Sequence, residues 1–185
     1  MTLIVIAVLA VLVLWLIAIY NKLVRFKNNR ENAFADIDVQ LRQRNDLVPQ
    51  LVSTVKGYAT HEKELLEGIT QARAGVMNAT TVNDKIIADT QMTQALQGLR
   101  VQLEAYPDLK ANTNFLQLQE EISDIENKLA SARRYFNGTT REYNTAIESF
   151  PANLIASSFG HTRQPMYELN TTDRKTMEQP PQINF

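Results

Sequence analysis

The sequence predicts an all-α protein in which a single N-terminal transmembrane helix precedes an elongated antiparallel bundle of three long helices and a short fourth helix. Three observations support this fold class: an uninterrupted apolar run at the start, a similar apolar periodicity directly after it, and a sustained heptad pattern near the end. With 185 residues, the chain has room for one anchor and one folded domain. We expect an anchor over 1–21, a bundle over 22–160 and an extended tail over 161–185.

The apolar run extends from Leu3 to Ile19 without a charged residue. As a helix it would span about 26 Å, close to the hydrocarbon thickness of a bilayer. A cleaved signal peptide is the competing interpretation, but it would need a positively charged start and a small-x-small cleavage site. The run is instead followed by Tyr-Asn-Lys-Leu. We therefore expect an uncleaved anchor.

The residues around the end of this run are of the types found at a membrane interface. Amphipathic aromatics come first and cations follow, with no acid between them. Because Lys and Arg favour the cytoplasmic flank, the sequence predicts an N-out, C-in orientation with the bundle in the cytoplasm. The cations could also contact anionic head groups, although a stop-transfer flank explains them more simply. The interface residues are Trp15, Tyr20, Lys22, Arg25, Lys27 and Arg30.

Two long helices are predicted from a 3-4 spacing of apolar residues. One covers Asn112 to Phe150, with Asn112 as its N-cap and Pro151 as its stop. The other follows the anchor, ends near Gly57 and should be kinked by Pro49. Their seams are Phe34, Ile37, Leu41, Arg44, Val48, Leu51, Val55 and Tyr58, and Phe115, Leu118, Ile122, Ile125, Leu129, Ala132, Phe136, Thr139, Tyr143, Ala146 and Phe150.

The segment between these two helices must bring the chain back. Thr60 can cap one helical stretch, and a second stretch leads to Tyr106. The polar, β-branched residues of Asn78–Asn83 either interrupt one helix or form a loop between two.

After Pro151, a short helix over 152–159 is expected before Gly160. The remaining tail is polar and without periodicity, and Tyr167 and Phe185 are the side chains that could dock it.

Four charged residues of the first bundle helix are interpreted as pairs that set register: Asp38, Arg42, Arg44 and Asp46. Asp38–Arg42 and Arg42–Asp46 have the i,i+4 spacing of helical ion pairs. Arg44 occupies a seam position, so we expect it to reach a carboxylate on a facing helix. Glu120, Glu121 and Asp124 are the candidates.

The sequence predicts no catalytic residue, no cofactor and no metal site. His61-Glu62 begins like a zinc-protease motif, but Leu65 stands where the second His is required. The chain has no Cys and no glycine-rich phosphate loop. Its net charge of −1 argues against nucleic-acid binding. No small-molecule substrate is evident. An unfamiliar carboxylate site around Asp36, Asp38 and Glu120–Glu121 is a remote alternative, because no base or nucleophile converges there.

Several strings, in order along almost the whole chain, resemble the LemA family of bacteria. They include Tyr20-Asn-Lys-Leu-Val24, Arg44-Asn-Asp-Leu-Val-Pro-Gln-Leu-Val52, Thr54-Val-Lys-Gly-Tyr-Ala59, Asn114-Phe-Leu-Gln-Leu-Gln-Glu-Glu121, Ala132-Arg-Arg-Tyr135 and Tyr143-Asn-Thr-Ala-Ile147. The resemblance implies one membrane helix followed by a helical bundle, in the bacterial inner membrane, and no established activity. Phe34 replaces a common Trp, and His161 replaces an aromatic residue after the glycine, which puts the docking of the tail in doubt.

These observations favour a non-enzymatic scaffold that recruits copies of itself, or another membrane protein, to the bilayer. The alternative is a membrane-shaping or anionic-lipid-binding protein that uses the basic flank. The expected partners are therefore the membrane, a homo-oligomer and possible further membrane proteins, without nucleic acid.

Overall fold

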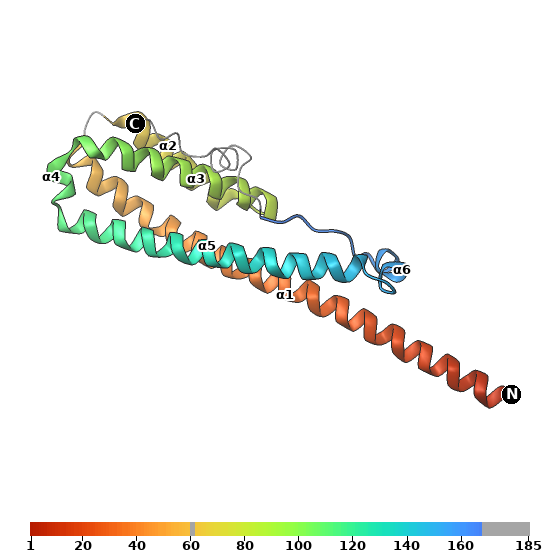
Figure 1. The fold of residues 1–185 in the computed structure, drawn as a ribbon. Coiled ribbons are helices and arrows are strands. Elements are labelled where there is room, and N and C mark those ends of the chain that lie inside the picture. Colours follow the sequence, from red (N-terminus) through yellow and green to blue (C-terminus); the bar gives the residue numbers. More distant parts are fainter. Residues whose placement is uncertain (60–61, 168–185) are drawn as a thin grey trace, which may run out of the picture. The chain divides into compact units, whose positions relative to one another are not determined.

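The computed structural model describes residues 1–59 and 62–167, and this part of the chain is helical without a strand (Figure 1). Four helices are long: α1 (Thr2–Lys56), α2 (Lys63–Asn78), α3 (Val82–Gln102) and α5 (Thr113–Glu148). Short helical turns connect or follow them: η1 (Leu103–Ala105), α4 (Pro107–Lys110), α6 (Asn153–Ala156) and η2 (Ser157–Phe159). The predicted all-α fold class, with one long apolar N-terminal helix, is confirmed.

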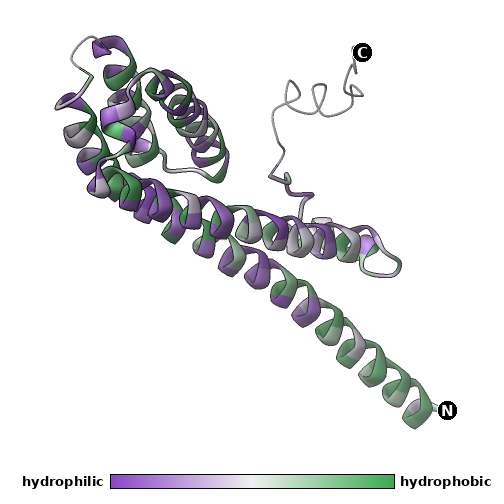
Figure 2. Ribbon diagram, turned by 60° about the vertical axis from the view of Figure 1, so that its left-hand side comes forward, coloured by the Kyte–Doolittle hydropathy of each residue, from purple (hydrophilic) through white to green (hydrophobic). Residues whose placement is uncertain are grey.

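The anchor and the first bundle helix are one continuous helix, α1, of 55 residues. Pro49 lies inside α1 without ending it, and the helix stops at Lys56, next to Gly57 as predicted. Figure 2 shows that the N-terminal part of α1 is uniformly hydrophobic, whereas its later turns alternate between hydrophobic and hydrophilic residues.

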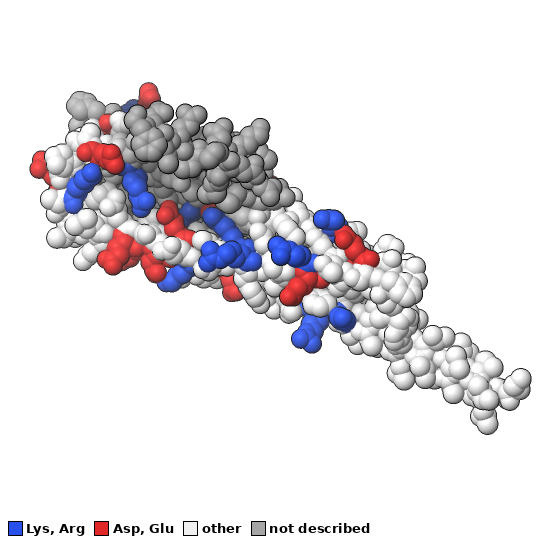
Figure 3. Space-filling model, in the orientation of Figure 1, with Lys and Arg blue, Asp and Glu red and all other residues white. Residues whose placement is uncertain are grey.

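The N-terminal part of α1 has the length and composition needed to cross a membrane. An 18-residue window reaches a mean hydropathy of 3.2, and none of it is buried. A core helix of comparable hydropathy would be covered by the rest of the chain. The view in Figure 3 likewise shows no charged side chain on this end of the helix.

The chain divides into two compact units, and α1 and α5 contribute to both. The first unit comprises Met1–Ile37 and Ser131–Met166. The second comprises Asp38–Ala130 and Tyr167.

In the second unit, α2 and α3 form a hairpin, so the Asn78–Asn83 segment separates two helices. Thr81 begins α3 with a capping box, in which its hydroxyl accepts from the Asp84 N–H and its own N–H donates to the Asp84 carboxylate. Asn112 caps α5 as predicted, because its Oδ1 accepts from the Phe115 N–H at 3.0 Å. The apolar core is formed by Val48, Leu51, Val55, Ala59, Leu66, Ile69, Ala72, Met92, Leu96, Leu99, Leu103, Leu109, Phe115 and Ile122.

In the first unit, α1 and α5 run in opposite directions and pack through Leu23, Tyr143 and Ile147 (Figure 1). The Phe34 and Phe136 rings meet at 5.5 Å between centroids. Most residues of the predicted seams are buried, but Tyr58 is 43% exposed and Phe150 is 79% exposed.

After α5, the chain forms α6 and η2, as expected for 152–159, and then turns at Gly160, whose φ of 74° is left-handed. Residues 161–167 have no regular structure. Thr60, His61 and Phe185, about which expectations were stated above, lie outside the described residues.

Candidate functional site

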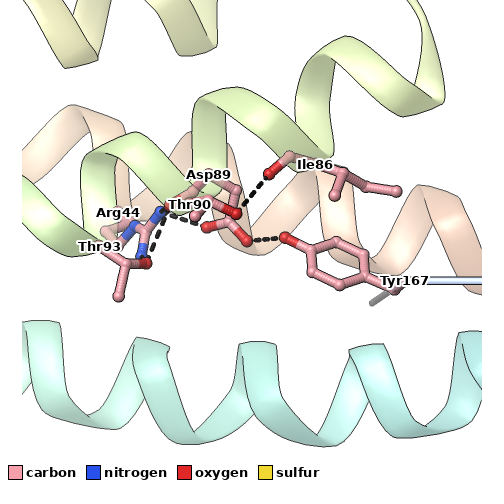
Figure 4. Close-up of polar contacts among 6 residues, drawn as sticks. All are labelled: Arg44, Ile86, Asp89, Thr90, Thr93 and Tyr167. Carbon is pink, nitrogen blue, oxygen red and sulfur yellow. Dashed lines mark hydrogen bonds and ion pairs between the residues drawn. The ribbon is translucent and has the colours of Figure 1, made fainter. Parts of the chain in front are cut away.

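The deepest polar cluster is in the second unit and consists of Arg44, Asp89, Thr93 and Tyr167, here called the Arg44 network (Figure 4). Arg44 on α1 forms an ion pair with the Asp89 carboxylate on α3 and donates to Thr93 Oγ1 at 3.1 Å. Arg44 and Asp89 are each 1% exposed. Burial of two charges is tolerated because the pair is in contact and further hydrogen bonds reach Arg44 Nη1 and Asp89 Oδ2.

Arg44 does pair with a carboxylate on a facing helix, as expected, but the three predicted partners are wrong. Glu120, Glu121 and Asp124 are exposed, and Asp124 instead pairs with Lys128 at 2.7 Å. The true partner, Asp89, lies between Ala88 and Met92 on the buried face of α3. A carboxylate within an apolar stripe was the signal that could have identified it.

Of the other predicted register residues, Asp38 is half-buried, and Arg42 and Asp46 lie at the surface. Asp38 accepts from Arg42 at 3.0 Å, as its i,i+4 spacing predicts, and also contacts Lys85 on α3. The Arg42 side chain is 76% exposed and Asp46 is exposed. Exposed pairs contribute about 0–1 kcal/mol. The exposed Arg42 therefore adds little stability through Asp38, whereas the Asp38–Lys85 pair, with side chains 21% and 17% exposed, links α1 to α3.

The aperiodic segment 161–167 is attached through Tyr167. The Tyr167 side chain is buried, and its hydroxyl donates to Asp89 Oδ2 (Figure 4). Arg44 contacts the other carboxylate oxygen, Oδ1. The sequence named Tyr167 as a docking residue, and the structure confirms it.

A second polar cluster surrounds Arg30 in the first unit. Its Nε donates to Thr140 Oγ1 at 3.2 Å, Nη2 donates to the Pro165 carbonyl at 3.4 Å, and the guanidinium lies 4.8 Å from the Phe136 ring centroid. Arg30 is 8% exposed, and burial lowers its pKa. The expectation that Arg30 belongs to an exposed basic flank is therefore wrong: its side chain is part of the interior of the first unit.

His161 is also held in the first unit, contrary to the doubt that its identity raised. His161 Nδ1 and the Tyr143 hydroxyl are hydrogen-bonded at 3.1 Å, and the His161 ring lies 6.3 Å from that of Tyr20. Burial, and secondly the charge of Lys27, lower the pKa of His161, whereas burial raises the pKa of Tyr143.

Two further hydrogen bonds hold the same segment. Asn144 Nδ2 donates to the Gln164 carbonyl and Asn144 Oδ1 accepts from the Gln164 N–H, both at 2.9 Å. This paired arrangement mimics a backbone ladder, so it orients the segment as well as attaching it. Asn144 was not singled out by the sequence, because a buried amide on a helix has no local signature.

The remaining predicted interface residues are exposed at or near the end of the apolar run. Trp15 and Tyr20 are 47% and 39% exposed, and Lys22, Arg25 and Lys27 are exposed as well. Tyr20 packs against Phe159 at 5.0 Å, and Lys22 lies over the Phe26 ring. Their contact with lipid stays a prediction.

Neither polar cluster has the features of a reaction centre. Thr93 is half-buried and lines the surface crevice described below, but Arg44 and Asp89 are enclosed, so a substrate could not reach the carboxylate without opening the unit. Among the described residues, no group of three His, Cys, Asp or Glu side chains could hold a metal. Of the residues that define the remote enzyme hypothesis, Asp36, Glu120 and Glu121 are exposed and Asp38 is half-buried.

A surface crevice of about 100 Å³ lies in the second unit. Its floor is apolar and includes Leu51, Leu96, Phe115 and Ile122. Polar side chains edge it, namely Gln97 and Arg100 from α3 and Gln119 and Glu126 from α5. Small-molecule sites usually enclose about 300–1,000 Å³, so this crevice suits a side chain better than a metabolite.

The chain is similar to proteins named LemA and MamQ. The chain is 27% identical to Protein LemA of Metamycoplasma hominis, over 83% of this chain and 71% of the relative. It is 21% identical to magnetosome protein MamQ of Magnetospirillum gryphiswaldense, over 78% of this chain, and to magnetosome protein MamQ 1 of Paramagnetospirillum magneticum, over 80%. These matches cover 62% and 64% of the two magnetosome proteins, less than two thirds of their length. The family model named LemA matches residues 33–185, which is most of the sequence, and the chain therefore belongs to the LemA family.

Proposed function

We propose that this protein is a non-enzymatic, membrane-anchored interaction protein that holds copies of itself or another membrane protein beside the bilayer. The observation that carries the proposal is the apolar crevice of the second unit. The buried charges of this unit serve its own packing, whereas the crevice offers apolar surface to a partner.

The anchoring half of the proposal rests on the N-terminal part of α1. This segment is exposed and apolar over the length needed to cross a bilayer. Exposed Lys22, Arg25 and Lys27 follow it without an intervening acid, which supports an N-out, C-in orientation in the bacterial inner membrane. Because α1 continues without interruption into both units, the folded part would be held close to the membrane.

The proposed interaction with a partner is supported by the residues that line the crevice. An apolar floor surrounded by polar side chains is the usual arrangement at the centre of a protein interface. A pocket of this size can accept one anchoring side chain of a partner, and such anchors supply much of the binding free energy. Exposed Val101 on α3 and Leu116 on α5 add apolar surface in the same unit.

Photo-crosslinking in native membranes tests this proposal. We would replace Gln97, an exposed residue that lines the crevice, with p-benzoylphenylalanine in the full chain. The matched control is Gln117, which is exposed on α5 and absent from the crevice lining. Crosslinked products would be identified by mass spectrometry.

The expected result is one dominant protein adduct from position 97 that is missing from position 117. A product of twice the monomer mass would identify self-association, and a different mass would identify another protein. Equal, diffuse labelling from both positions, or none from either, would contradict the proposal.

A further inference from the structure

The segment 149–160, here called the foot, is packed against α1 where its apolar run ends. The Phe159 ring contacts the Tyr20 ring at 5.0 Å, and Ala156 packs with Leu23 in the core of the first unit. Tyr20 directly follows the last residue of the apolar run, Ile19. The foot is therefore held at the level of α1 where a membrane-spanning helix would leave the hydrocarbon.

The foot exposes an unusual amount of apolar surface for so short a segment. Phe150 is 79% exposed, Leu154 67% and Phe159 56%. Phe150 belongs to the predicted seam of α5 but lies beyond the helix end at Glu148 and does not contribute to the core. Large apolar side chains gathered on one surface usually mark a contact with protein or membrane.

We propose that the foot is a second membrane contact, with Phe150, Leu154 and Phe159 inserted among lipid head groups beside the anchor. Interfacial elements of this kind bury their apolar side chains about 5–10 Å into the boundary between head groups and acyl chains. Phe and Tyr side chains suit this depth because it offers both apolar and polar surroundings. The inference rests on α1 crossing the membrane and is independent of any partner at the crevice.

A groove beside the foot favours lipid as the occupant. Its volume is about 570 Å³, and its walls are formed largely by apolar side chains of α1, α5 and the foot, including Ile19, Phe26 and Phe150. Lys22 and Arg141 also line it, together with the single acid Glu142. Apolar walls with an excess of cations are complementary to the acyl chain and the phosphate of a phospholipid.

Lipid-depth quenching on the reconstituted full chain tests this inference. Because the sequence has no cysteine, a single substitution gives a unique attachment point. We would label Leu154→Cys with an environment-sensitive fluorophore in phosphatidylcholine vesicles, with and without a lipid that carries a nitroxide quencher near the head group.

The matched control is Tyr135→Cys. Tyr135 is 58% exposed and belongs to the same unit, but it lies about 20 Å back along α5 from Glu148. In the protein without added cysteine, the single tryptophan, Trp15, reports insertion of the anchor in the same vesicles. Since the quencher is present in both leaflets, the direction of insertion does not affect the result.

We expect quenching by the nitroxide lipid at position 154 and at Trp15, but little at position 135. Equal quenching at positions 154 and 135 would overturn the inference while leaving the anchor intact. A blue-shifted but unquenched label at position 154 would overturn it as well, because protein rather than lipid would cover the foot. An unquenched Trp15 would overturn both the foot and the anchor, whereas a failed crosslink from Gln97 would affect neither.

Discussion

Two buried arginines on one helix are accommodated in opposite ways. Arg30 and Arg44 lie about four turns apart on α1, and each is less than a tenth exposed. In the first unit, Arg30 is held by a hydroxyl, a carbonyl and an aromatic ring. In the second, Arg44 is neutralised by the Asp89 carboxylate, which also receives Tyr167.

The difference shows where the stability of each unit is concentrated. A buried ion pair contributes little net stability, but removal of one partner leaves the other charge buried and unpaired, which strongly lowers the free energy of unfolding. When a guanidinium is removed from neutral acceptors, hydrogen bonds are lost but no unpaired charge stays buried. Sensitivity to substitution should therefore be greatest on the acid of the Arg44 network and smaller around Arg30.

The largest effect is expected for Asp89→Asn, which leaves the Arg44 charge buried without a counterion. The free energy of unfolding should fall by about 3–5 kcal/mol. Urea unfolding of the full chain in detergent, followed by helical circular dichroism, measures this. Asp124→Asn is the control, because the Asp124–Lys128 pair is more than half exposed and its loss should cost less than about 1 kcal/mol. Equal losses for both variants would contradict the comparison.

The next effect concerns the attachment of segment 161–167. Tyr167→Phe keeps the buried ring but removes the donor to Asp89, and a hydrogen bond to a charged group is worth about 1.5–3 kcal/mol. Amide exchange in residues 161–167 should accelerate by about tenfold or more, since 1.4 kcal/mol corresponds to a factor of ten. Unchanged exchange would show that the hydroxyl does not hold the segment.

A smaller effect is expected for Arg30→Met. The substitution retains an unbranched apolar chain over Phe136 and removes the donors to Thr140 and Pro165. The same urea experiment should show a loss of about 1–2 kcal/mol. A loss as large as that of Asp89→Asn would mean that the neutral surroundings of Arg30 are as critical as the ion pair.

The smallest effect is a pH dependence centred on His161. Its pKa is lowered in the folded protein, mainly by burial, so the unfolded state binds more protons as the pH falls below about 6.5. The contribution of neutral His161 to the free energy of unfolding is therefore complete above that pH, and it is lost as the pH falls through the folded-state pKa. Burial raises the pKa of Tyr143, the hydrogen-bond partner of His161, further above this range.

Hydrogen exchange measures this dependence. After correction for the intrinsic rate, exchange in residues 161–167 should be faster at pH 5.5 than at pH 7.5. His161→Phe should abolish the difference while keeping an aromatic ring beside Tyr20 and Tyr143. A variant that retains the pH dependence would assign it to another group.

Local patterns were sufficient to predict the helices. The cap at Asn112, the break over Asn78–Asn83 and the end of α1 near Gly57 each follow from residues within one turn. The partner of Arg44 was missed because two helices offered carboxylates, and the signal that singles out Asp89, its place within the apolar stripe of α3, was not used.

Arg30 was misassigned although the sequence contains a usable signal. It precedes Phe34, Ile37, Leu41 and Arg44 at the same 3-4 spacing, so the seam extends one step closer to the anchor than was predicted. Because Arg30 follows three other cations after the apolar run, it was assigned to the membrane interface rather than to the seam. The contacts of residues 161–167 had no such signal, because a segment without periodicity docks through individual side chains such as Tyr167 and Asn144.

We proposed that the surface crevice, rather than the buried charges, is the site of interaction. Partner capture by a chain that carries Arg44→Met, Asp89→Leu and Tyr167→Phe together tests it most directly, because apolar replacement of a whole buried network is often tolerated. The same chain would carry the crosslinker at position 97 in native membranes, and circular dichroism would verify its folding. We expect the wild-type adduct in undiminished yield. Loss of the adduct from a folded triple variant would contradict it.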